Sequence, residues 1–386
     1  MQATNASTPI ANHSGTIFIA IELSQKTWLV TLHSPDKERM SRYKLDGGDH
    51  VGLLVLIERL RERAGRALGA VPAVVSCYEA GYDGFWLHRL LTRAGISNHV
   101  FDPASIAVDQ RARRAKTDRI DGEQLLRTLM AYCRGEPRVV RIVRVPSPDQ
   151  EDARRDSRER QRLIQEQTAH SNRIKALLRL WGMAVGNPRR RDWLSWLAAQ
   201  RDWQGQAVPP RAMAELEREH RRLMLVREQL AALDEPPVRA QPTAAAAQMA
   251  ERRERLLRLK GPGPVFAATL TNEVLYKDFR NRREVAGYCG LAPSPWRSGR
   301  IDREQGISKA GNRRARHAAV ELAWLWLRHQ PDSALTQWFR QRTAGAGGRI
   351  KRIAIVALAR KLIVALWRYL TTGLLPDHAV LKAAKA

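Results

Sequence analysis

Four acidic residues are spaced so that together they could bind a divalent metal ion. Asp118 and Asp121 are three residues apart in residues 115–122, where a helical pattern begins. Because three residues are close to one helical turn, both carboxylates project from the same face and can share one cation. Glu22 and Glu79 each follow a short apolar run of the kind that forms a buried strand. Carboxylates on two strand ends and one helix start favour metal-dependent phosphodiester chemistry.

The expected ion is Mg²⁺, with Mn²⁺ as the alternative. Four like charges repel one another unless a hard cation lies between them, and Mg²⁺ accepts carboxylate, water and phosphate oxygens in octahedral geometry. One or two such ions can activate an attacking oxygen and stabilise a leaving one. Taken singly, each acid also has an ordinary explanation as a solvated charge. Asp118 and Asp121 would suit the first turn of any helix.

The elements that would position these acids follow an α/β pattern. The predicted elements are, in order, strands at 16–22, 28–33 and 41–45, a helix at 50–64, a strand at 73–79, a helix at 83–94, a strand near 98–101 and a helix at 119–133. Strands that alternate with helices favour a partly parallel sheet. This order is the plan of a ribonuclease-H-like fold. In that plan Glu22 lies on the central strand, Glu79 on the neighbouring strand, and Asp118 and Asp121 close the site from a helix.

The charge of the chain indicates a polyanionic partner. Its 386 residues contain 66 Lys and Arg against 39 Asp and Glu, a formal net charge of +27. Such a surplus causes self-repulsion unless a polyanion offsets it, and arginine is the better bidentate ligand of phosphate. A basic membrane-surface protein is the competing class. The chain has no apolar run of about 18 residues and no signal-peptide pattern, so we expect a cytoplasmic protein without a membrane partner. Its three cysteines lack metal-ligand spacing and are expected to be reduced.

The middle of the chain has the apolar periodicity of two long helices. Two seams have spacings of three and four residues: Leu163, Gln167, His170, Ile174, Leu177 and Trp181, then Met213, Leu216, His220, Leu223, Val226, Leu230 and Leu233. This spacing is typical of a coiled coil, and the two helices could pair with each other or with a second subunit. Residues 234–247 have the composition of a linker.

A glycine- and proline-rich turn opens the C-terminal third. Residues 259–264 precede an apolar helix predicted at 265–275. Such a turn exposes backbone N–H groups that can hold a phosphate, so Gly261 and Gly263 are candidate contacts to nucleic acid, in a turn that resembles a helix-hairpin-helix. The alternative is that the turn only caps an ordinary helix. Further helices are predicted at 281–288, 313–329 and 350–370.

From about residue 16 to residue 372, the chain resembles a transposase of the IS110 family, which includes the IS1111 branch. The N-terminal signature is Lys-Thr-Asp-Arg-Ile-Asp at 116–121. The C-terminal signature is Gly-Leu-Ala-Pro at 290–293, Ser-Gly at 298–299 and Gly-Ile-Ser-Lys-Ala-Gly-Asn-Arg-Arg at 306–314. The two halves at this separation are specific, whereas either alone would be less so.

The resemblance implies a RuvC-like domain whose DEDD tetrad maps onto Glu22, Glu79, Asp118 and Asp121. Glu22 departs from the usual Asp, although its longer side chain can still reach a metal. The resemblance also assigns Ser298 as the nucleophile on DNA, in a Gly- and Arg-rich loop where a serine is otherwise an ordinary turn residue. It further implies a covalent Ser298–DNA intermediate, donor and target DNA as substrates, a structured guide RNA, and dimers that pair into a tetramer.

The chain is therefore expected to have three domains: a RuvC-like domain at 16–145, a helical coiled-coil connector at 151–254 and a C-terminal transposase domain at 255–375. The candidate nucleic-acid contacts are Lys116, Arg119, Gly261, Gly263, Arg297, Arg300, Lys309, Asn312 and Arg313. Two other interpretations stay open. One is a metal-dependent nuclease or resolvase-like enzyme in which Ser298 is structural. The other is a non-catalytic nucleic-acid-binding relative.

Overall fold

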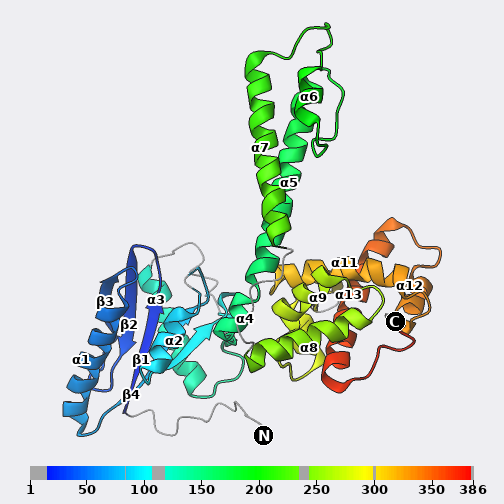
Figure 1. Cartoon of the computed structure of the whole chain (residues 1–386). Helices are drawn as coiled ribbons and strands as arrows, with labels where there is room; N and C mark the ends of the chain where they lie inside the picture. Colours follow the sequence, from blue (N-terminus) through cyan, green and yellow to red (C-terminus); the bar gives the residue numbers. More distant parts are fainter. Residues whose placement is uncertain (1–14, 83, 107–117, 234–242, 299–300, 384–386) are drawn as a thin grey trace. The chain divides into compact units, whose positions relative to one another are not determined.

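The computed structural model describes residues 15–82, 84–106, 118–233, 243–298 and 301–383. The chain divides after Pro146 into two compact units, which we describe separately. The first unit is coloured blue to cyan in Figure 1. The second contains both the predicted connector and the predicted C-terminal domain.

A five-stranded mixed sheet forms the centre of the first unit. Its strands are β1 (Thr16–Glu22), β2 (Thr27–His33), β3 (Ser41–Asp46), β4 (Ala73–Glu79) and β5 (Ser97–Phe101), in the order β3-β2-β1-β4-β5. β1 is antiparallel to β2 and parallel to β4, and β4 is parallel to β5. The predicted α/β unit with a central first strand is confirmed, and the strand ranges differ from prediction by at most one residue.

Helices cover both faces of this sheet. They are α1 (His50–Leu68), α2 (Trp86–Arg93) and α3 (Asp118–Cys133), with a short 3₁₀ turn η2 (Pro103–Ser105) after β5. Because side chains alternate along a strand, Ile17, Ile19 and Ile21 pack with α1 and α2, whereas Phe18 and Ala20 pack with α3. Burial on both faces explains why β1 is an almost unbroken apolar run.

The second unit begins with a helical hairpin. Its helices are α4 (Pro148–Asp152), α5 (Arg155–Leu180), α6 (Trp193–Ala198) and α7 (Pro210–Ala232). Figure 1 shows α5 and α7 side by side. His170 contacts Glu219 and Arg173 contacts Glu215, both at 2.7 Å. The residue numbers rise along α5 while those of the partners on α7 fall, so the two helices are antiparallel. The two apolar seams therefore pack against each other within one chain.

The rest of the second unit is mainly helical. Its elements are α8 (Ala244–Arg258), α9 (Pro264–Leu270), a π-helical turn η3 (Thr271–Leu275), α10 (Arg282–Tyr288), β6 (Pro293–Ser298), β7 (Ile301–Ile307), α11 (Arg313–His329), α12 (Ala334–Thr343) and α13 (Gly348–Thr372). Leu322 and Trp326 of α11 and Leu358 and Leu362 of α13 lie in its core. Within the described ranges, none of the helices is long and apolar enough to span a membrane.

Three local expectations differ from the structure. The predicted helix at 265–275 is α-helical only to Leu270 and then widens to a π-helical turn. The segment around Ser298, expected to be a loop, forms an antiparallel β-hairpin. Helix α8 begins at Ala244, inside the predicted linker, and residues 234–242 of that linker lie outside the described residues. Proline and glycine obscured the hairpin because they interrupt the alternation by which a strand is recognised.

Candidate active site

Glu22 and Glu79 are adjacent at the carboxyl edge of the sheet. Ile21 pairs with Tyr78 in the parallel register of β1 and β4, so the next residue of each strand, Glu22 and Glu79, lies beside the other. Phe18 and Ala20 of β1 face α3, as do Val75 and Cys77 of β4. By the two-residue period of a strand, both glutamates project toward the same face of the sheet as α3.

Helix α3 approaches this edge closely because residue 122 is a glycine. A Cβ atom on Gly122 would lie 2.6 Å from Oγ1 of Thr31 and 3.7 Å from Cδ2 of Leu29. Leu29 is the β2 partner of Glu22, so the start of α3 lies over β2, next to the end of β1. Further along, Sγ of Cys77 is 3.9 Å from the backbone oxygen of Leu125, which fixes the helix over β4.

The first turn of α3 contains the two remaining acids of the predicted tetrad. Asp118 is its first residue, and Asp121 lies one turn later and is half-buried. The side chain of Asp118 is outside the described residues. Among the side chains that are described, no group of three or more His, Cys, Asp or Glu residues is arranged to hold a metal ion. The backbone therefore brings the four positions to one edge, and their joint coordination of a metal stays a prediction.

The donor atoms at this edge suit a hard cation. Burial, with the nearby Cys133 and the charge of Glu79, raises the pKa of the Cys77 thiol well above its ordinary value. That thiol stays protonated at neutral pH, and it is buried. The groups that this edge can offer to a metal are then carboxylate oxygens, which suit Mg²⁺ or Mn²⁺ better than soft metals.

Ser298 lies at the tip of the β6–β7 hairpin. It is the last residue of β6 and pairs with Ile301, the first residue of β7. Arg297, next to it, pairs with Asp302. The side chains of Ser298 and Arg297, and all of Arg300, lie outside the described residues. The backbone thus places Ser298 at the end of a two-stranded arm.

Close backbone contacts hold the base of this arm. The N–H of Ser308 donates to the oxygen of Ala292 at 2.8 Å, and the N–H of Lys309 donates to the oxygen of Gly290 at 3.1 Å. Gly290 has φ +65°, and a Cβ atom there would lie 2.2 Å from the oxygen of Ala310. Only glycine avoids that clash in this backbone conformation. The glycine in the Gly-Leu-Ala-Pro motif thus positions the arm that carries Ser298.

A buried carboxylate that the sequence did not indicate contacts the start of α11, the helix that follows the arm. Glu273, 1% exposed, accepts hydrogen bonds from Nε of Arg158 at 2.9 Å and from Nη1 of Arg314 at 3.2 Å. Nδ2 of Asn312 donates to it at 3.0 Å. Burial opposes ionisation of this carboxyl, but its hydrogen bonds and the two arginine charges hold its pKa below the ordinary value. The only sequence signal was a lone acid within an apolar helical run.

This contact gives Asn312 a role inside the protein. Its Oδ1 accepts from the N–H of Ala315 at 3.0 Å and so caps α11, while its Nδ2 reaches Glu273. Lys309 and Arg313 are exposed on either side of it. The predicted contacts of these three residues with nucleic acid stay predictions.

The remaining predicted contacts are distributed over both units. Gly261 and Gly263 lie in the turn between α8 and α9, and Gly261 has φ +109°. The same turn is bound to the C-terminal segment, because the N–H of Lys260 donates to the oxygen of Val380 at 3.1 Å. Arg119 lies in the first turn of α3, with its side chain outside the described residues, and Lys116 lies outside them altogether.

Two regions of the chain match family models of known proteins. Residues 19–183, which include the acidic edge, match the sequence model of the DEDD transposases of IS110 type. Residues 253–338, which include the arm, match the model described as the transposase IS116/IS110/IS902 family. The chain is 46% identical over 385 residues to transposase y4rJ of Sinorhizobium fredii, covering 98% of this chain and 97% of that protein. The chain belongs to the IS110 family of transposases.

Two more distant relatives are also named as transposases. Transposase y4qE of Sinorhizobium fredii is 27% identical over 322 residues, which cover 76% of this chain and 74% of that protein. A family 20 transposase of Pseudomonas aeruginosa is 26% identical over 308 residues, covering 78% of this chain and 84% of that protein. The enzyme is thus a DNA transposase of an insertion sequence, and the four acidic positions lie within the region that matches the DEDD model.

Proposed function

We propose that this IS110-family transposase cuts and rejoins DNA through a covalent Ser298–DNA intermediate. Oγ of Ser298 attacks the scissile phosphorus, the bond from phosphorus to the leaving nucleotide oxygen breaks, and that oxygen takes up a proton. A hydroxyl of the partner strand then attacks the phosphoserine, and Ser298 regains its proton as it leaves. One phosphoester bond is exchanged for another at each step, so no nucleotide triphosphate is consumed. The position of Ser298 at the tip of an arm with a fixed base supports this proposal.

We further propose that Glu22, Glu79, Asp118 and Asp121 hold Mg²⁺, or Mn²⁺ in its place. Such an ion, when bound, neutralises phosphate charge and lowers the pKa of an attacking hydroxyl. The strand ends provide two carboxylates on a rigid frame, and the first turn of α3 provides the other two. Carboxylate oxygens that do not contact the metal can accept the proton that the attacking hydroxyl loses.

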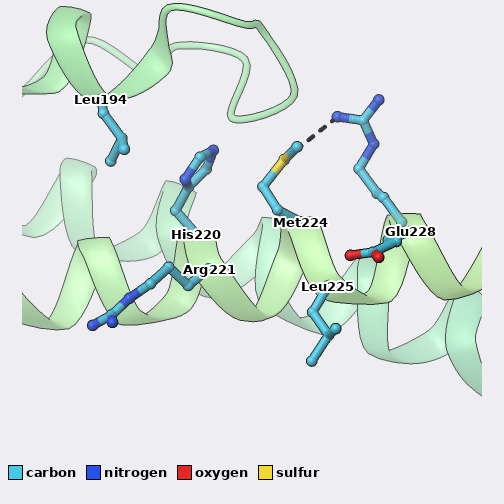
Figure 2. A pocket seen from close by; sticks show the side chains of 7 residues that line it. Leu194, His220, Arg221, Met224, Leu225 and Glu228 are labelled. Carbon is cyan, nitrogen blue, oxygen red and sulfur yellow. Dashed lines mark hydrogen bonds between the residues drawn. The ribbon is translucent and has the colours of Figure 1, made fainter.

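We also propose that the enzyme acts as an oligomer guided by a structured RNA. The net charge of +27 favours polyanionic partners, and a structured RNA is such a partner as well as DNA. A cavity of about 660 Å³ lies beside α7, and Figure 2 shows Leu194 of α6 and Met224 and Leu225 of α7 around it. These side chains are 50%, 41% and 53% exposed. They lie among His220, Arg221, Arg227 and Glu228, and exposed apolar side chains within a polar rim support pairing with a second copy.

The decisive experiment is an adduct assay. The purified protein is incubated with Mg²⁺, RNA transcribed from the element and end-labelled junction DNA, then denatured and examined for DNA-linked protein. We expect an adduct with the wild-type enzyme and with Ser308→Ala, which removes a nearby exposed hydroxyl from the same motif. Ser298→Ala and Asp118→Ala should give none. Metal-dependent cleavage that persists in Ser298→Ala without any adduct would instead establish a nuclease in which Ser298 is structural.

A further inference from the structure

A groove in the second unit has a strongly cationic lining. Its volume is about 860 Å³, and it lies between α10, α12, α13 and the segment that follows α13. Five cations line it, against the single carboxylate of Asp377: Arg282, Arg283, Arg360, Lys361 and Arg368. Apolar side chains, among them Val364, Leu374 and Leu375, line the rest. None of these five cations belongs to the signature motifs or to the acidic site.

The cations of this groove are not neutralised by neighbouring acids. On other helices some basic residues pair with acids along the same helix, as Arg162 does with Glu166 and Arg255 with Glu251. Within the described part of the chain, none of the five groove cations makes an ion pair, and Lys361 instead lies 4.8 Å from the ring centre of Trp338. Five unpaired cations around one concavity repel one another, and a bound polyanion would relieve that repulsion.

The spacing of the cations fits a chain of phosphates. Arg360 and Arg368 are eight residues apart on α13, which is about 12 Å along the helix axis. A spacing of this size suits successive phosphates of one strand better than a single phosphate group. The exposed Leu374 and Leu375 offer an apolar surface beside this row, against which sugars and bases can lie.

The groove also adjoins the arm that carries Ser298. Ala292 and Pro293 line it, and Pro293 begins β6, the strand that ends at Ser298. We propose that this groove binds the phosphate backbone of one strand of the DNA substrate and so guides that strand toward the arm. The choice of DNA as the occupant rests on the proposed role of Ser298. The inference that a nucleic-acid strand occupies the groove rests on the charge and shape of the groove.

Site-specific cross-linking tests the location directly. Cys77, Cys133 and Cys289 are buried, so a thiol-directed photo-cross-linker attached to Leu374→Cys, a position 63% exposed, labels the full-length protein at one place. The probe is a radiolabelled single-stranded DNA from the element end, with a guide-RNA transcript as competitor. We expect cross-links to DNA from Leu374→Cys and few from Leu180→Cys, an exposed control position at the end of α5. Equal yields from both positions, or cross-links to RNA in place of DNA, would overturn the proposal.

The salt dependence of binding tests the electrostatic part. Log affinity falls with log salt concentration, and each lost contact with a phosphate makes this slope less steep by about 0.7 for a single strand. The variant Arg282→Gln/Arg283→Gln/Arg368→Gln should therefore reduce the slope by about 2. The matched control Arg349→Gln/Lys351→Gln/Arg352→Gln removes the same charge from exposed positions on the first turns of α13, outside the groove. It should change the slope much less, and equal reductions in both variants would contradict the assignment.

The same binding assay separates this inference from the proposed chemistry. Ser298→Ala should bind single-stranded DNA with an unchanged salt slope, because the groove cations remain. If Ser298→Ala still cleaves DNA while Leu374→Cys cross-links to DNA, the nucleophile assignment fails and the groove stands. If the adduct forms normally in the groove variant with an unchanged salt slope, the groove assignment fails and the nucleophile stands.

Discussion

Nδ2 of Asn312 and Oε2 of Glu273 are 3.0 Å apart, and this hydrogen bond joins the start of α11 to the π-helical turn η3. Arg158 brings the base of α5 to the same carboxylate, and Arg314 adds a second contact from α11. Three elements that are far apart in sequence therefore share one buried acid. Because α11 directly follows the β6–β7 arm, this cluster fixes the base on which Ser298 is presented.

We expect Glu273→Ala to destabilise the second unit by about 3 kcal/mol. The substitution leaves Arg314 without its buried partner, and the value lies at the low end for a broken buried pair because Arg158 is half exposed. Urea unfolding followed by circular dichroism measures the change. Glu254→Ala, at an exposed position on α8, is the control and should change stability by less than about 0.5 kcal/mol. Similar effects of the two substitutions would show that the cluster is not structural.

The same carboxylate should make stability depend on acid pH. The folded-state pKa of Glu273 lies below its ordinary value of 4.5, so its stabilising contribution is present above that value and is lost as pH falls through the depressed pKa. The stability difference between wild type and Glu273→Gln should thus shrink as the pH is lowered below 4.5. Urea midpoints measured at several pH values test this, and a difference that grows toward acid pH would contradict it.

Two glycines with positive φ provide a matched test of the arm's base. Gly311 has φ +101°, and a Cβ atom there would lie 2.4 Å from the oxygen of Tyr288, whereas Gly306 has φ +89° with open space around it. Gly306→Ala should lower the free energy of unfolding by about 1–2 kcal/mol, because of the strained backbone alone. Gly311→Ala should lower the free energy of unfolding by clearly more, and it should also reduce adduct formation. Thermal unfolding and the adduct assay distinguish the two, and equal costs would show that the close contact has no importance.

The contact between Gly122 and Thr31 should control the acidic edge. Gly122→Ala places a methyl group 2.6 Å from Oγ1 of Thr31, and we expect α3, with Asp118 and Asp121, to move away from the sheet. A displacement of about 1 Å at a catalytic site can lower the rate on the order of a hundredfold. Thr31→Ala removes the clashing oxygen, so the double variant should regain most of the adduct yield. A double variant as inactive as Gly122→Ala would show that the clash is not the cause.

Glu22 can be tested by its conservative replacements. Glu22→Asp keeps a carboxylate at the end of β1 and should retain Mn²⁺ binding and adduct formation, whereas Glu22→Gln removes the charge and should weaken both. Isothermal titration with Mn²⁺ measures the first property independently of activity. Asp46→Asn, an acid at the exposed end of β3, is the control and should leave Mn²⁺ affinity unchanged. Unchanged Mn²⁺ binding in Glu22→Gln would exclude this residue as a ligand.

Much of the first unit was predictable because its elements are specified locally. The apolar runs that end in Glu22 and Glu79 identify β1 and β4 by themselves, since strands buried on both faces must be continuously apolar. The same reasoning predicts that both acids lie at the carboxyl edge, because the two strands are parallel. The apolar seams that contain His170 and His220 also predict long helices, but they do not predict which element each helix packs against.

The amino-acid sequence by itself determined which groups are available for chemistry: the acidic positions, the excess of arginine, and the family motifs that contain Ser298. Only the tertiary structure decided which groups meet. The pairing of α5 with α7, the selection of Glu273 by Arg158, Asn312 and Arg314, and the convergence of five cations on one groove all join residues remote in the chain. Such contacts depend on how whole elements pack, and local periodicity contains no information about a partner a hundred residues away.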